Sequence, residues 1–510
     1  MPGWSYSSSR RTKLPGVVIF LLFLAWAFIR IAMEQRLYWQ SLSTMASETR
    51  SPLDLQSTFR LALRDSTSSQ SFRQKKNPQN HSLTKAPTPK SPHNNPPQLP
   101  ASKWQRLEDS LLATPTSFYM YDDPRIVRPR EVTYFRQHKL KHRWRAKGLA
   151  ELDILQALWQ HPWRVQDPAQ ADYFVIPLPL TALYATNASG FYEAFPAILE
   201  QSSFQKHEGH HHVLVSQLNY WFTYGLARKL QRQLRQYYPS VWNITLAKEQ
   251  GSRNIQRGYE RGIFSSWGPV VEQNRHNMTR SGFATGLLPV SSTERTIPAS
   301  WEKFRQASLF LFYHCREREF VSNSTGIRKL LIQHYNQYNN SNSTMADPIP
   351  PKLPPSSIGH DIPYEQWARE YADSQFCLVV RGDNPQSKAL LRAVQVGCIP
   401  IVVSDAYPYY APPLEAVMSM DDYAFFISEA AYWKDPIGEL LKFRALEPSV
   451  IQDKLQGLAF AQRALLPFDH PLNRSNHLFV PAFWHAVKDA KRHESSLTEY
   501  PSDFPNGFKK

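Results

Sequence analysis

Cysteine and glycine are scarce in this chain, whereas proline is abundant. Three cysteines in 510 residues exclude a small fold stabilised by several disulfides and a zinc module built on several cysteine ligands. The 19 glycines are outnumbered by 40 prolines, which favours extended linkers and stiff loops, and no internal repeat is found. Apolar residues still make up 42% of the chain and aromatic residues 13%, which is too much for a disordered protein. At this length the chain should hold two or three globular units.

Acidic residues are also few, because 43 Asp and Glu stand against 59 Lys and Arg and leave a net charge of +16. Residues 1–33 carry +4 of this excess and residues 34–103 carry +6. A nucleic-acid-binding protein would carry its Lys and Arg clusters on the folded part, so no nucleic-acid partner is expected. A membrane-anchored protein that binds polyanions through the basic residues 34–103 stays open as an alternative.

One long apolar run, Leu14–Ile29, stands near the start and extends to Met33 if Arg30 snorkels. A spanning helix needs about 20 residues, so 14–33 is sufficient for a thin bilayer. Basic residues precede the run, which keeps residues 1–13 cytosolic. A cleaved signal peptide is the alternative, but no small-residue cleavage site follows closely. We therefore expect a signal anchor and a single-pass type II membrane protein.

Asn-x-Ser/Thr sequons follow this run in a number that exceeds chance. All of them lie C-terminal to the predicted anchor, which fits a lumenal body. The eight sequons begin at Asn80, Asn187, Asn243, Asn277, Asn323, Asn339, Asn342 and Asn473.

Two segments are of low complexity. Residues 34–103 are polar and hold seven prolines between 77 and 100, so they cannot bury enough apolar area to fold and are expected to form a disordered stem. The Asn/Ser- and Pro-rich stretch Asn336–Ser357 is expected to be a long surface loop within the folded body.

Apolar runs typical of buried strands alternate with helical patterns through the rest of the chain, which predicts the α/β class with parallel sheets and crossover helices. The available length favours two doubly wound domains, 104–295 and 296–490, followed by a C-terminal tail, 491–510. The expected strands are Ser117–Tyr121, Tyr173–Pro177, Val213–Val215, Leu309–Tyr313, Phe376–Val380 and Ile399–Val403. The expected helices are 149–160, 217–237, 326–335, 364–373 and 386–396.

The segment Phe376–Pro400 is the most informative one. A buried strand is followed by a loop and by a helix for which Asn384 suits the N-cap and Pro385 the first helical position. Gly397 supplies the stop of this helix, before the next parallel strand. Phosphate groups bind at such helix starts and at the carboxyl ends of parallel strands, so the pattern predicts a phosphate site.

Residues 376–405 resemble the C-terminal signature of the exostosin family of Golgi glycosyltransferases. That signature has a Phe-Cys-Leu strand, a Gly-Asp turn with Pro and Ser, a helix, and Gly-Cys-(Ile/Val)-Pro-Val-Ile before Ser-Asp. The matching residues are Phe376-Cys377-Leu378, Gly382-Asp383, Pro385, Ser387, Gly397-Cys398-Ile399-Pro400-Ile401-Val402 and Ser404-Asp405.

The preceding half is similar to the same family at fewer positions. FYMYDDP at 118–124 resembles the family's first strand, and DPAQADYFVIPL at 167–178 resembles its Asp-Pro-x-x-Ala-Asp-x-Phe-x-x-Pro motif. Gly209–His212 matches a Gly-Arg-Asp-His motif only at its ends, and Arg328 matches a family arginine. The likeness covers about 105–490.

The resemblance implies a GT-B architecture, in which two Rossmann-like doubly wound domains face each other across a cleft. It implies inverting transfer of a sugar from a nucleotide-sugar donor, with a UDP-sugar expected, to a glycan or glycoprotein acceptor at the Golgi membrane. The C-terminal domain would hold the donor, and the N-terminal domain would bind the acceptor and supply a base. Assembly with itself or with another glycosyltransferase stays open.

Candidate site residues follow from these roles. Helix N–H groups and basic side chains can neutralise the leaving diphosphate without a metal, so no cofactor besides the donor is expected. Inverting transfer also needs a carboxylate or a His as base. The donor-binding candidates are Arg328, Arg381, Gly382, Asp383, Ser387 and Lys388. The candidate bases are Asp122, Asp172 and His212, with Asp123 beside them.

One departure from the family pattern bears on activity. The family usually has Arg-Leu-x-(Asp/Glu)-Ala in the helix after the loop, whereas this chain places Arg392 at the acidic position. If that acid contacts the donor, donor choice differs or activity is lost. The alternative function is thus a catalytically inactive lumenal relative that binds glycan or nucleotide sugar and assists a partner enzyme, and the absence of a compensating acid near Arg392 would favour it.

The remaining constellations are weaker. The histidines at 207 and 210–212 resemble a metal cluster, but neighbouring residues of a strand point to opposite faces, and Asp421-Asp422 is more typical of a solvated turn. Cys377 and Cys398 both border predicted strands, and a bridge between them and two buried free thiols are equally compatible with the sequence.

Overall fold

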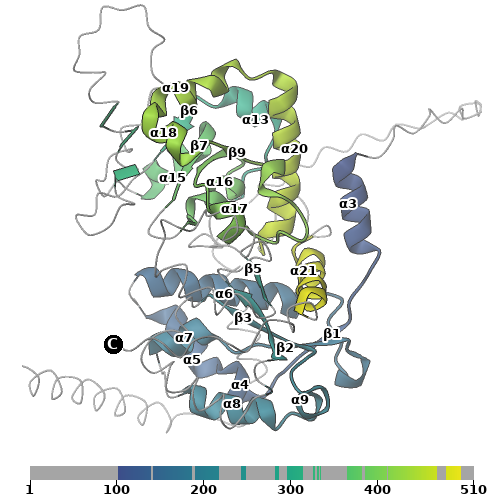
Figure 1. Ribbon diagram of the computed structural model, residues 1–510. Coiled ribbons are helices and arrows are strands. Elements are labelled where there is room, and N and C mark those ends of the chain that lie inside the picture. Colours follow the sequence, from purple (N-terminus) through teal and green to yellow (C-terminus); the bar gives the residue numbers. More distant parts are fainter. Residues whose placement is uncertain are drawn as a thin grey trace, which may run out of the picture. The chain divides into compact units, whose positions relative to one another are not determined.

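The computed structural model is a mixed α/β protein with two parallel β-sheets, as predicted (Figure 1). The predicted tail, the predicted anchor and nearly all of the predicted stem lie outside the described residues. In the part that is described, no helix has the length and apolar character needed to cross a membrane. The structure describes residues 102–138, 142–186, 190–217, 240, 243–248, 282–285, 296–313, 326–327, 330–331, 333–334, 364–381, 385–410, 412–467 and 478–494.

The first sheet has five parallel strands in the order β1-β2-β3-β4-β5. Three of them are the strands expected from the apolar runs, and β4 and β5 were not predicted. The strands are β1 (Phe118–Met120), β2 (Tyr173–Ile176), β3 (His212–Ser216), β4 (Thr245–Lys248) and β5 (Gly282–Ala284). The helices and the 3-10 turn between them are α4 (Pro124–Val127), α5 (Pro129–Gln137), α6 (His142–Gln160), η2 (Pro168–Gln170), α7 (Leu180–Thr186), α8 (Phe191–Leu199) and α9 (Ser202–His207).

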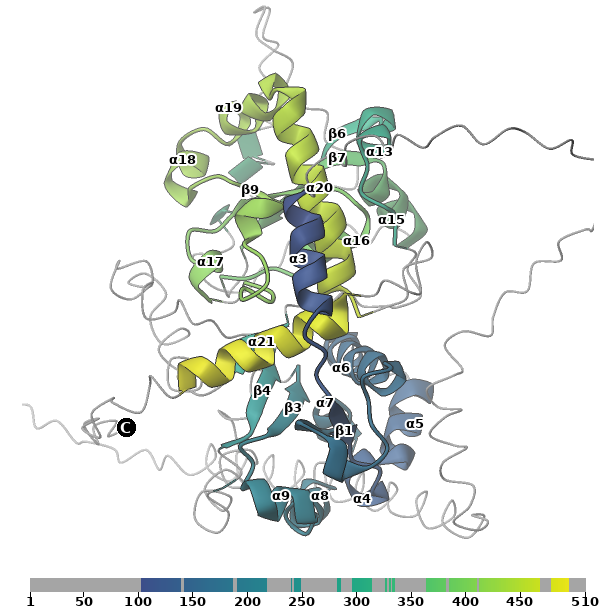
Figure 2. The same cartoon turned by 90° about the vertical axis from the view of Figure 1, so that its right-hand side faces the viewer.

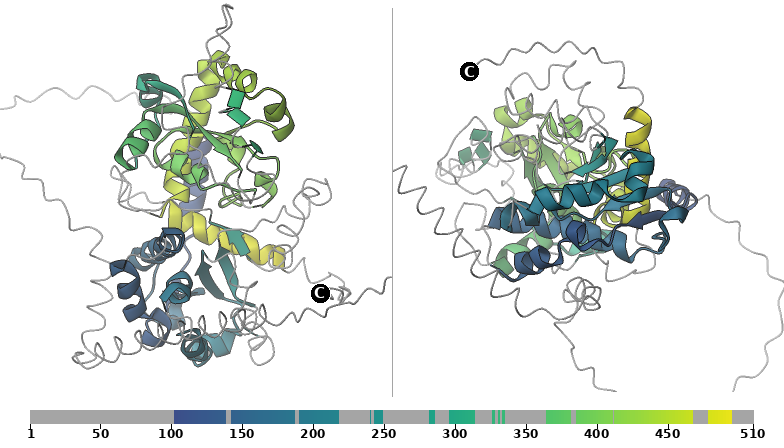
Figure 3. Two further views of the ribbon diagram at one scale, coloured as in Figure 1. Left: turned by 90° about the vertical axis from the view of Figure 1, so that its left-hand side faces the viewer. Right: turned by 90° about the horizontal axis from the view of Figure 1, so that it is seen from below.

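Side chains of the first sheet alternate between its two faces, as expected of strands buried on both sides. Val213 and Val215 of β3 join one hydrophobic cluster, whereas Leu214 joins another with Phe174 and Ile176 of β2. Helices α8 and α9 cover the second of these faces. Figure 3 shows the strands of this sheet with the helices around them.

The last helix of the described chain, α21 (Phe479–Glu494), packs against the first sheet although the sequence assigned it to the second domain (Figure 2). The Trp484 ring of α21 contacts the rings of Phe118 and Tyr173, with centroids 4.8 and 5.3 Å apart. Lys491 also donates a hydrogen bond to the backbone carbonyl of Asn243. The predicted domain bounds themselves stay a prediction.

The second sheet has four parallel strands in the order β6-β7-β8-β9. Its strands are β6 (Leu309–Phe312), β7 (Ser374–Val380), β8 (Ile399–Val403) and β9 (Phe425–Phe426). The first three were predicted. Its helices and 3-10 turns are α13 (Trp301–Gln306), α15 (Tyr364–Ala372), α16 (Ala389–Gln395), α17 (Tyr407–Tyr410), η6 (Met420–Asp422), α18 (Glu429–Lys434), α19 (Pro436–Leu441), η7 (Lys442–Ala445) and α20 (Pro448–Leu465).

Helix α3 (Lys103–Leu112) begins inside the segment that the sequence assigned to the stem. Its Trp104 ring contacts Phe460 of α20, with centroids 5.1 Å apart, and Lys103 forms an ion pair with Asp422. A buried Trp and an ion pair to distant residues show that the folded body starts by Lys103.

The central unit of the second sheet runs from β7 through α16 to β8. Helix α16 begins at Ala389, with Lys388 at its N-cap, so the prediction of a helix start at Asn384 and Pro385 was wrong. The stop at Gly397 is confirmed, because this residue has φ +62° and a Cβ there would lie 2.8 Å from the carbonyl oxygen of Ile297. A side chain at this position would both strain the backbone and clash.

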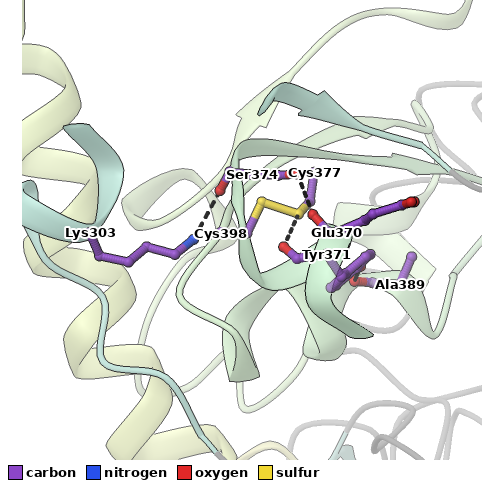
Figure 4. Close-up of a disulfide and its surroundings, with 7 residues drawn as sticks. All are labelled: Lys303, Glu370, Tyr371, Ser374, Cys377, Ala389 and Cys398. Atoms are coloured by element: carbon purple, nitrogen blue, oxygen red, sulfur yellow. Dashed lines mark hydrogen bonds between the residues drawn. A yellow bond between two sulfur atoms is a disulfide. The ribbon is translucent and has the colours of Figure 1, made fainter. Parts of the chain in front are cut away.

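A disulfide joins Cys377 of β7 to Cys398 just before β8 (Figure 4). The Cα atoms are 5.8 Å apart, and both residues are fully buried beside Phe312 and Tyr371. The sequence left this pairing open, and Cys315 lies outside the described residues. The bridge closes a loop that contains the rest of β7, the segment after it and the whole of α16.

Candidate functional site

Three successive strands of the second sheet end in charged residues that bond to one another. Arg381 follows β7, Asp405 lies two residues after β8, and Glu429 lies three residues after β9. The Arg381 Nε is 2.7 Å from a Glu429 carboxylate oxygen, and the Glu429 backbone N–H donates to the Asp405 carboxylate at 3.1 Å. The strands are parallel, so these side chains meet at one carboxyl edge of the sheet.

Glu429 is the acid that sequence reasoning missed at this edge. Its side chain is 17% exposed and that of Arg381 is 13% exposed, so the pair is largely shielded from water. Burial raises the pKa of Glu429, and the facing Arg381 guanidinium opposes that rise. The strand Phe425–Phe426 that positions Glu429 has only two residues, too short for an alternation signal.

Hydrogen bonds from three elements hold the segment 385–389, which leads into α16. Ser404 donates to the Pro385 carbonyl at 2.8 Å, and the Tyr407 hydroxyl donates to the Ser387 carbonyl at 3.3 Å. Tyr371 of α15 donates to the Ala389 carbonyl at 2.8 Å (Figure 4). The predicted donor ligands Ser387 and Lys388 therefore lie in a segment that is fixed to the neighbouring strand and helices.

Two buried glutamines near this sheet differ in how their amides are satisfied. Gln462 of α20 accepts from the Ala299 N–H and donates to the carbonyls of Ile297 and Val394. Gln386 is equally buried, at 3% exposure, but neither atom of its amide has a hydrogen-bond partner among the residues that the structure describes. A buried amide without partners costs about 1–3 kcal/mol, so the segment after β7 carries an unmet hydrogen-bonding group.

Arg392, at the position that is usually acidic in the resemblance, stacks on an aromatic ring. Its guanidinium carbon lies 4.8 Å from the ring centroid of Trp367, a residue of α15. The charge of Arg392 is thus placed against α15 by a cation–π contact.

Three of the predicted donor ligands fall in parts of the chain that the structure does not describe. Arg328, Gly382 and Asp383 lie outside the described residues. Of the six predicted donor ligands, the structure brings Arg381, Ser387 and Lys388 to the same sheet edge and leaves the role of each as a prediction.

The candidate bases of the first sheet are divided between its two edges. Asp122 lies two residues after β1, at the carboxyl edge, is exposed, and accepts a long 3.4 Å hydrogen bond from Tyr119. Asp123 is the N-cap of α4 and pairs with Arg125, so it has a structural role. An exposed carboxylate at a carboxyl edge is accessible to a substrate hydroxyl.

Asp172 and His212 lie at the opposite, amino edge of the same sheet. Asp172 precedes β2, and one of its carboxylate oxygens accepts from both the backbone N–H and the hydroxyl of Ser117. His212 is the first residue of β3, is fully buried and stacks on Phe174, with ring centroids 4.9 Å apart. Burial lowers the pKa of His212 to about 3, so the ring is neutral at physiological pH.

The first sheet also holds a buried carboxyl group that sequence reasoning missed. Glu151 of α6 is fully buried and accepts hydrogen bonds from the backbone N–H and the hydroxyl of Thr181, each at 3.0 Å. It also accepts from the backbone N–H of Gln217, directly after β3. Burial raises the pKa of Glu151 to about 7. This group ties α6, the start of α7 and the carboxyl end of β3 together.

A comparison with protein-family models finds the Exostosin GT47 domain over residues 115–441, well over half of the chain. The chain belongs to the exostosin GT47 family. In the comparison with curated proteins, no protein matches this chain at a significant level. The resemblance stated from the motifs is thereby confirmed.

The exostosin GT47 domain contains both sheets and the charged edge described above, and it ends with α19. Membership of this glycosyltransferase family implies a nucleotide-sugar donor and a glycan acceptor. Within the described ranges, no three His, Cys, Asp or Glu side chains are placed to hold a metal ion. Asp421-Asp422 belongs to the 3-10 turn η6, which Ser419 caps. That no metal is required stays a prediction.

Proposed function

We propose that this protein is an inverting glycosyltransferase that transfers a sugar from a UDP-sugar to a glycan or glycoprotein acceptor. In this proposal the two sheets belong to a GT-B arrangement, with the donor on the second sheet and the acceptor on the first. The carrying observation is the bonded cluster of Arg381, Asp405 and Glu429 at the carboxyl edge of three parallel strands. Ligands of open α/β sheets gather at such edges.

The chemistry assigns one role to each sheet. Asp122 takes the proton of the acceptor hydroxyl, whose oxygen attacks the anomeric carbon from the face opposite the diphosphate. The bond between that carbon and the diphosphate oxygen breaks as the new glycosidic bond forms, which inverts the configuration. Arg381 and Lys388, together with Arg328, stabilise the negative charge that develops on the leaving nucleoside diphosphate. Gly382, Asp383 and Ser387 complete the donor loop of this proposal.

The proposed location is the lumenal side of the Golgi membrane, with residues 14–33 as a type II signal anchor. The Cys377–Cys398 disulfide supports an oxidising compartment, because such bridges are rare in the reducing cytosol. The eight sequons after the predicted anchor support the same side of the membrane. Digestion of the full-length chain with an N-glycosidase should increase its gel mobility, and an unchanged mobility after expression in a secretory host would contradict this location.

The inactive alternative would be favoured if no acid compensated for the charge reversal at Arg392. Glu429 supplies a carboxylate at the donor edge from α18, and Arg381 holds it in place. Because a carboxylate is present at this edge after all, the charge reversal at Arg392 does not by itself argue for loss of activity. This observation supports the enzymatic function.

The test is a screen of the full-length protein against nucleotide sugars, measuring binding by calorimetry and donor consumption with and without glycan acceptors. Arg381→Ala should weaken binding of the accepted donor by about ten- to a hundredfold, because a charge-assisted hydrogen bond contributes about 1.5–3 kcal/mol. Lys388→Ala should act similarly. The control is Lys442→Ala, whose exposed side chain pairs with Glu439 and should leave binding unchanged. If no nucleotide sugar binds the native protein, the proposed function is wrong.

A further inference from the structure

An exposed tryptophan stands on the same short helix as Glu429. Among the described residues, four large apolar side chains are strongly exposed, and Trp433 of α18, at 44%, is the one Trp in that set. An exposed indole leaves a large flat apolar surface in contact with water, and rings of this kind are efficient stacking partners for ligands. The other three exposed side chains are Leu112, Tyr184 and Val450.

The Trp433 ring lies against a glycine from another part of the chain. A Cβ added at Gly326 would lie 2.8 Å from the indole Cη2 atom, so any larger residue there would displace the ring. The chain therefore leaves space at Gly326 for the indole to lie close to the backbone. The ring thus has protein on one side, while the residue as a whole is 44% exposed.

Trp433 and Glu429 are four residues apart in α18, so they are neighbours on one face, with Cβ atoms about 5–6 Å apart. Glu429 is the residue that Arg381 holds at the carboxyl edge of the second sheet. An oriented, partly accessible carboxylate and an exposed aromatic ring thus lie side by side at the edge to which the proposed function assigns the donor.

We propose that Glu429 and Trp433 form the nucleoside subsite of this protein, an inference that rests on the proposed function. A carboxylate has two oxygens that can each accept a hydrogen bond from one hydroxyl of a vicinal diol, as ribose presents. An aromatic ring stacks on the face of a nucleobase, and such stacking is worth about 1–3 kcal/mol per base. The two side chains are spaced as neighbouring parts of one ligand, so Glu429 binds the ribose and Trp433 the base.

This assignment gives Arg381 a second role. Its Nε donates to Glu429 at 2.7 Å, so it orients the carboxylate in addition to any contact with phosphate. The acid that recognises the ribose then comes from α18, whereas the α16 position carries Arg392 stacked on Trp367. The subsite thus needs no acid in α16.

The experiment measures binding of UDP and of 2′-deoxy-UDP to the full-length protein by calorimetry, with GDP and its 2′-deoxy form as a second pair. The native protein should bind the ribose form about tenfold more tightly than the deoxy form. Glu429→Gln should weaken binding of the ribose form about tenfold and that of the deoxy form, which keeps its 3′-hydroxyl, by clearly less, so the preference for ribose shrinks. A general loss of structure would lower both affinities by the same factor.

Trp433→Ala should weaken binding of both forms by about ten- to a hundredfold, and Trp433→Phe should restore most of the affinity, because stacking needs a ring rather than an indole N–H. Tyr184→Ala, at an exposed aromatic of α7, is the matched control and should bind like the native protein. Thermal melting of each variant checks folding.

The outcomes separate the subsite from the proposed function. If the native protein binds nucleotide sugars but Glu429→Gln keeps the ribose preference, the subsite is wrong and the function stands. If Trp433→Ala weakens nucleotide sugars yet leaves UDP binding unchanged, the ring contacts the sugar and the nucleoside assignment is overturned. If no nucleotide binds the native protein, the proposed function fails and the subsite fails with it.

Discussion

The carboxyl edges of the two parallel sheets satisfy their charged groups in different ways. On the second sheet, Arg381, Asp405 and Glu429 bond to one another and stay partly accessible. On the first sheet, Glu151 is fully buried and bonded to backbone and hydroxyl groups, while Asp122 is exposed with a single long hydrogen bond. The second edge thus holds its charged groups in a bonded cluster, whereas the first leaves one carboxylate exposed with a single long hydrogen bond.

The largest expected effect tests the two edges of the first sheet against each other. Asp122→Asn should lower kcat by about 10²–10⁴-fold, the usual contribution of a general base, without changing the melting temperature. Asp172→Ala, which removes both hydrogen bonds from Ser117, should instead destabilise the fold by about 1–2 kcal/mol and leave kcat unchanged. Turnover and thermal melting of both variants check this. If Asp172→Ala lost turnover and Asp122→Asn did not, the base would be Asp172 at the amino edge, and its assignment to Asp122 would be wrong.

The second-largest effect concerns the disulfide of the second sheet. Breaking this bridge should lower the free energy of unfolding. A bridge that closes a loop of about 20 residues contributes about 3 kcal/mol to the free energy of unfolding. Cys377→Ala, Cys398→Ala and the double variant should therefore melt at similarly reduced temperatures, because either single change already breaks the bridge. Scanning calorimetry under non-reducing conditions measures this. Additive effects of the two single changes would show that lost packing, and not the bridge, is responsible.

The buried carboxyl of the first sheet should make stability depend on pH. The native pKa of Glu151, raised to about 7, lies above that of the unfolded chain, so the native state binds the proton more tightly. The stabilisation is complete below about pH 4.5 and is lost as the pH rises through 7. Glu151→Gln should destabilise the protein by about 1–3 kcal/mol, and by more at pH 5 than at pH 8.

Urea unfolding of the native protein and of Glu151→Gln at both pH values measures this difference. Glu200→Gln is the control for removal of a surface carboxylate, since the Glu200 side chain is 58% exposed and pairs with Arg125. An equal destabilisation at pH 5 and pH 8 would mean that Glu151 titrates in the native state as it does in the unfolded chain.

The smallest effect concerns Arg392. Arg392→Ala should cost about 0.5–1 kcal/mol of stability, because it removes the cation–π contact with Trp367. Arg392→Glu should be somewhat less stable still and should not raise nucleotide-sugar affinity, since this side chain faces α15. Melting temperature and donor affinity are the measurements. An increased affinity in Arg392→Glu would show that an acid at this position binds the donor and that Glu429 does not replace it.

Much of the fold could be predicted from local patterns. Continuous apolar runs located six of the nine strands found in the described residues, because strands buried on both faces need such runs. Of the strands that were missed, β4 includes the polar residues Thr245 and Lys248 and β5 begins with Gly282, so neither is a continuous apolar run, and β9 has only two residues. The start of α16 was predicted too early. Asn384 and Pro385 favour a helix start locally, but hydrogen bonds from Ser404 and Tyr407 to the carbonyls of Pro385 and Ser387 hold the residues before Ala389 in another conformation.

The same patterns also held a signal that would have ranked the candidate bases. Asp122 follows its predicted strand, whereas Asp172 and His212 precede theirs. In a parallel sheet the residue after a strand lies at the carboxyl edge and the residue before it at the amino edge. Direction along the chain alone therefore favours Asp122.

The sequence by itself determined the α/β class, the strands with long apolar runs and the family, because these depend on residues close together in the chain. Only the tertiary structure decided which charges meet. Arg381 and Glu429 are 48 residues apart, and Gly326 and Trp433 are more than 100 apart. Parallel strands joined by crossover helices bring the ends of distant segments to one edge of the sheet. No local sequence pattern predicts which side chains pair there.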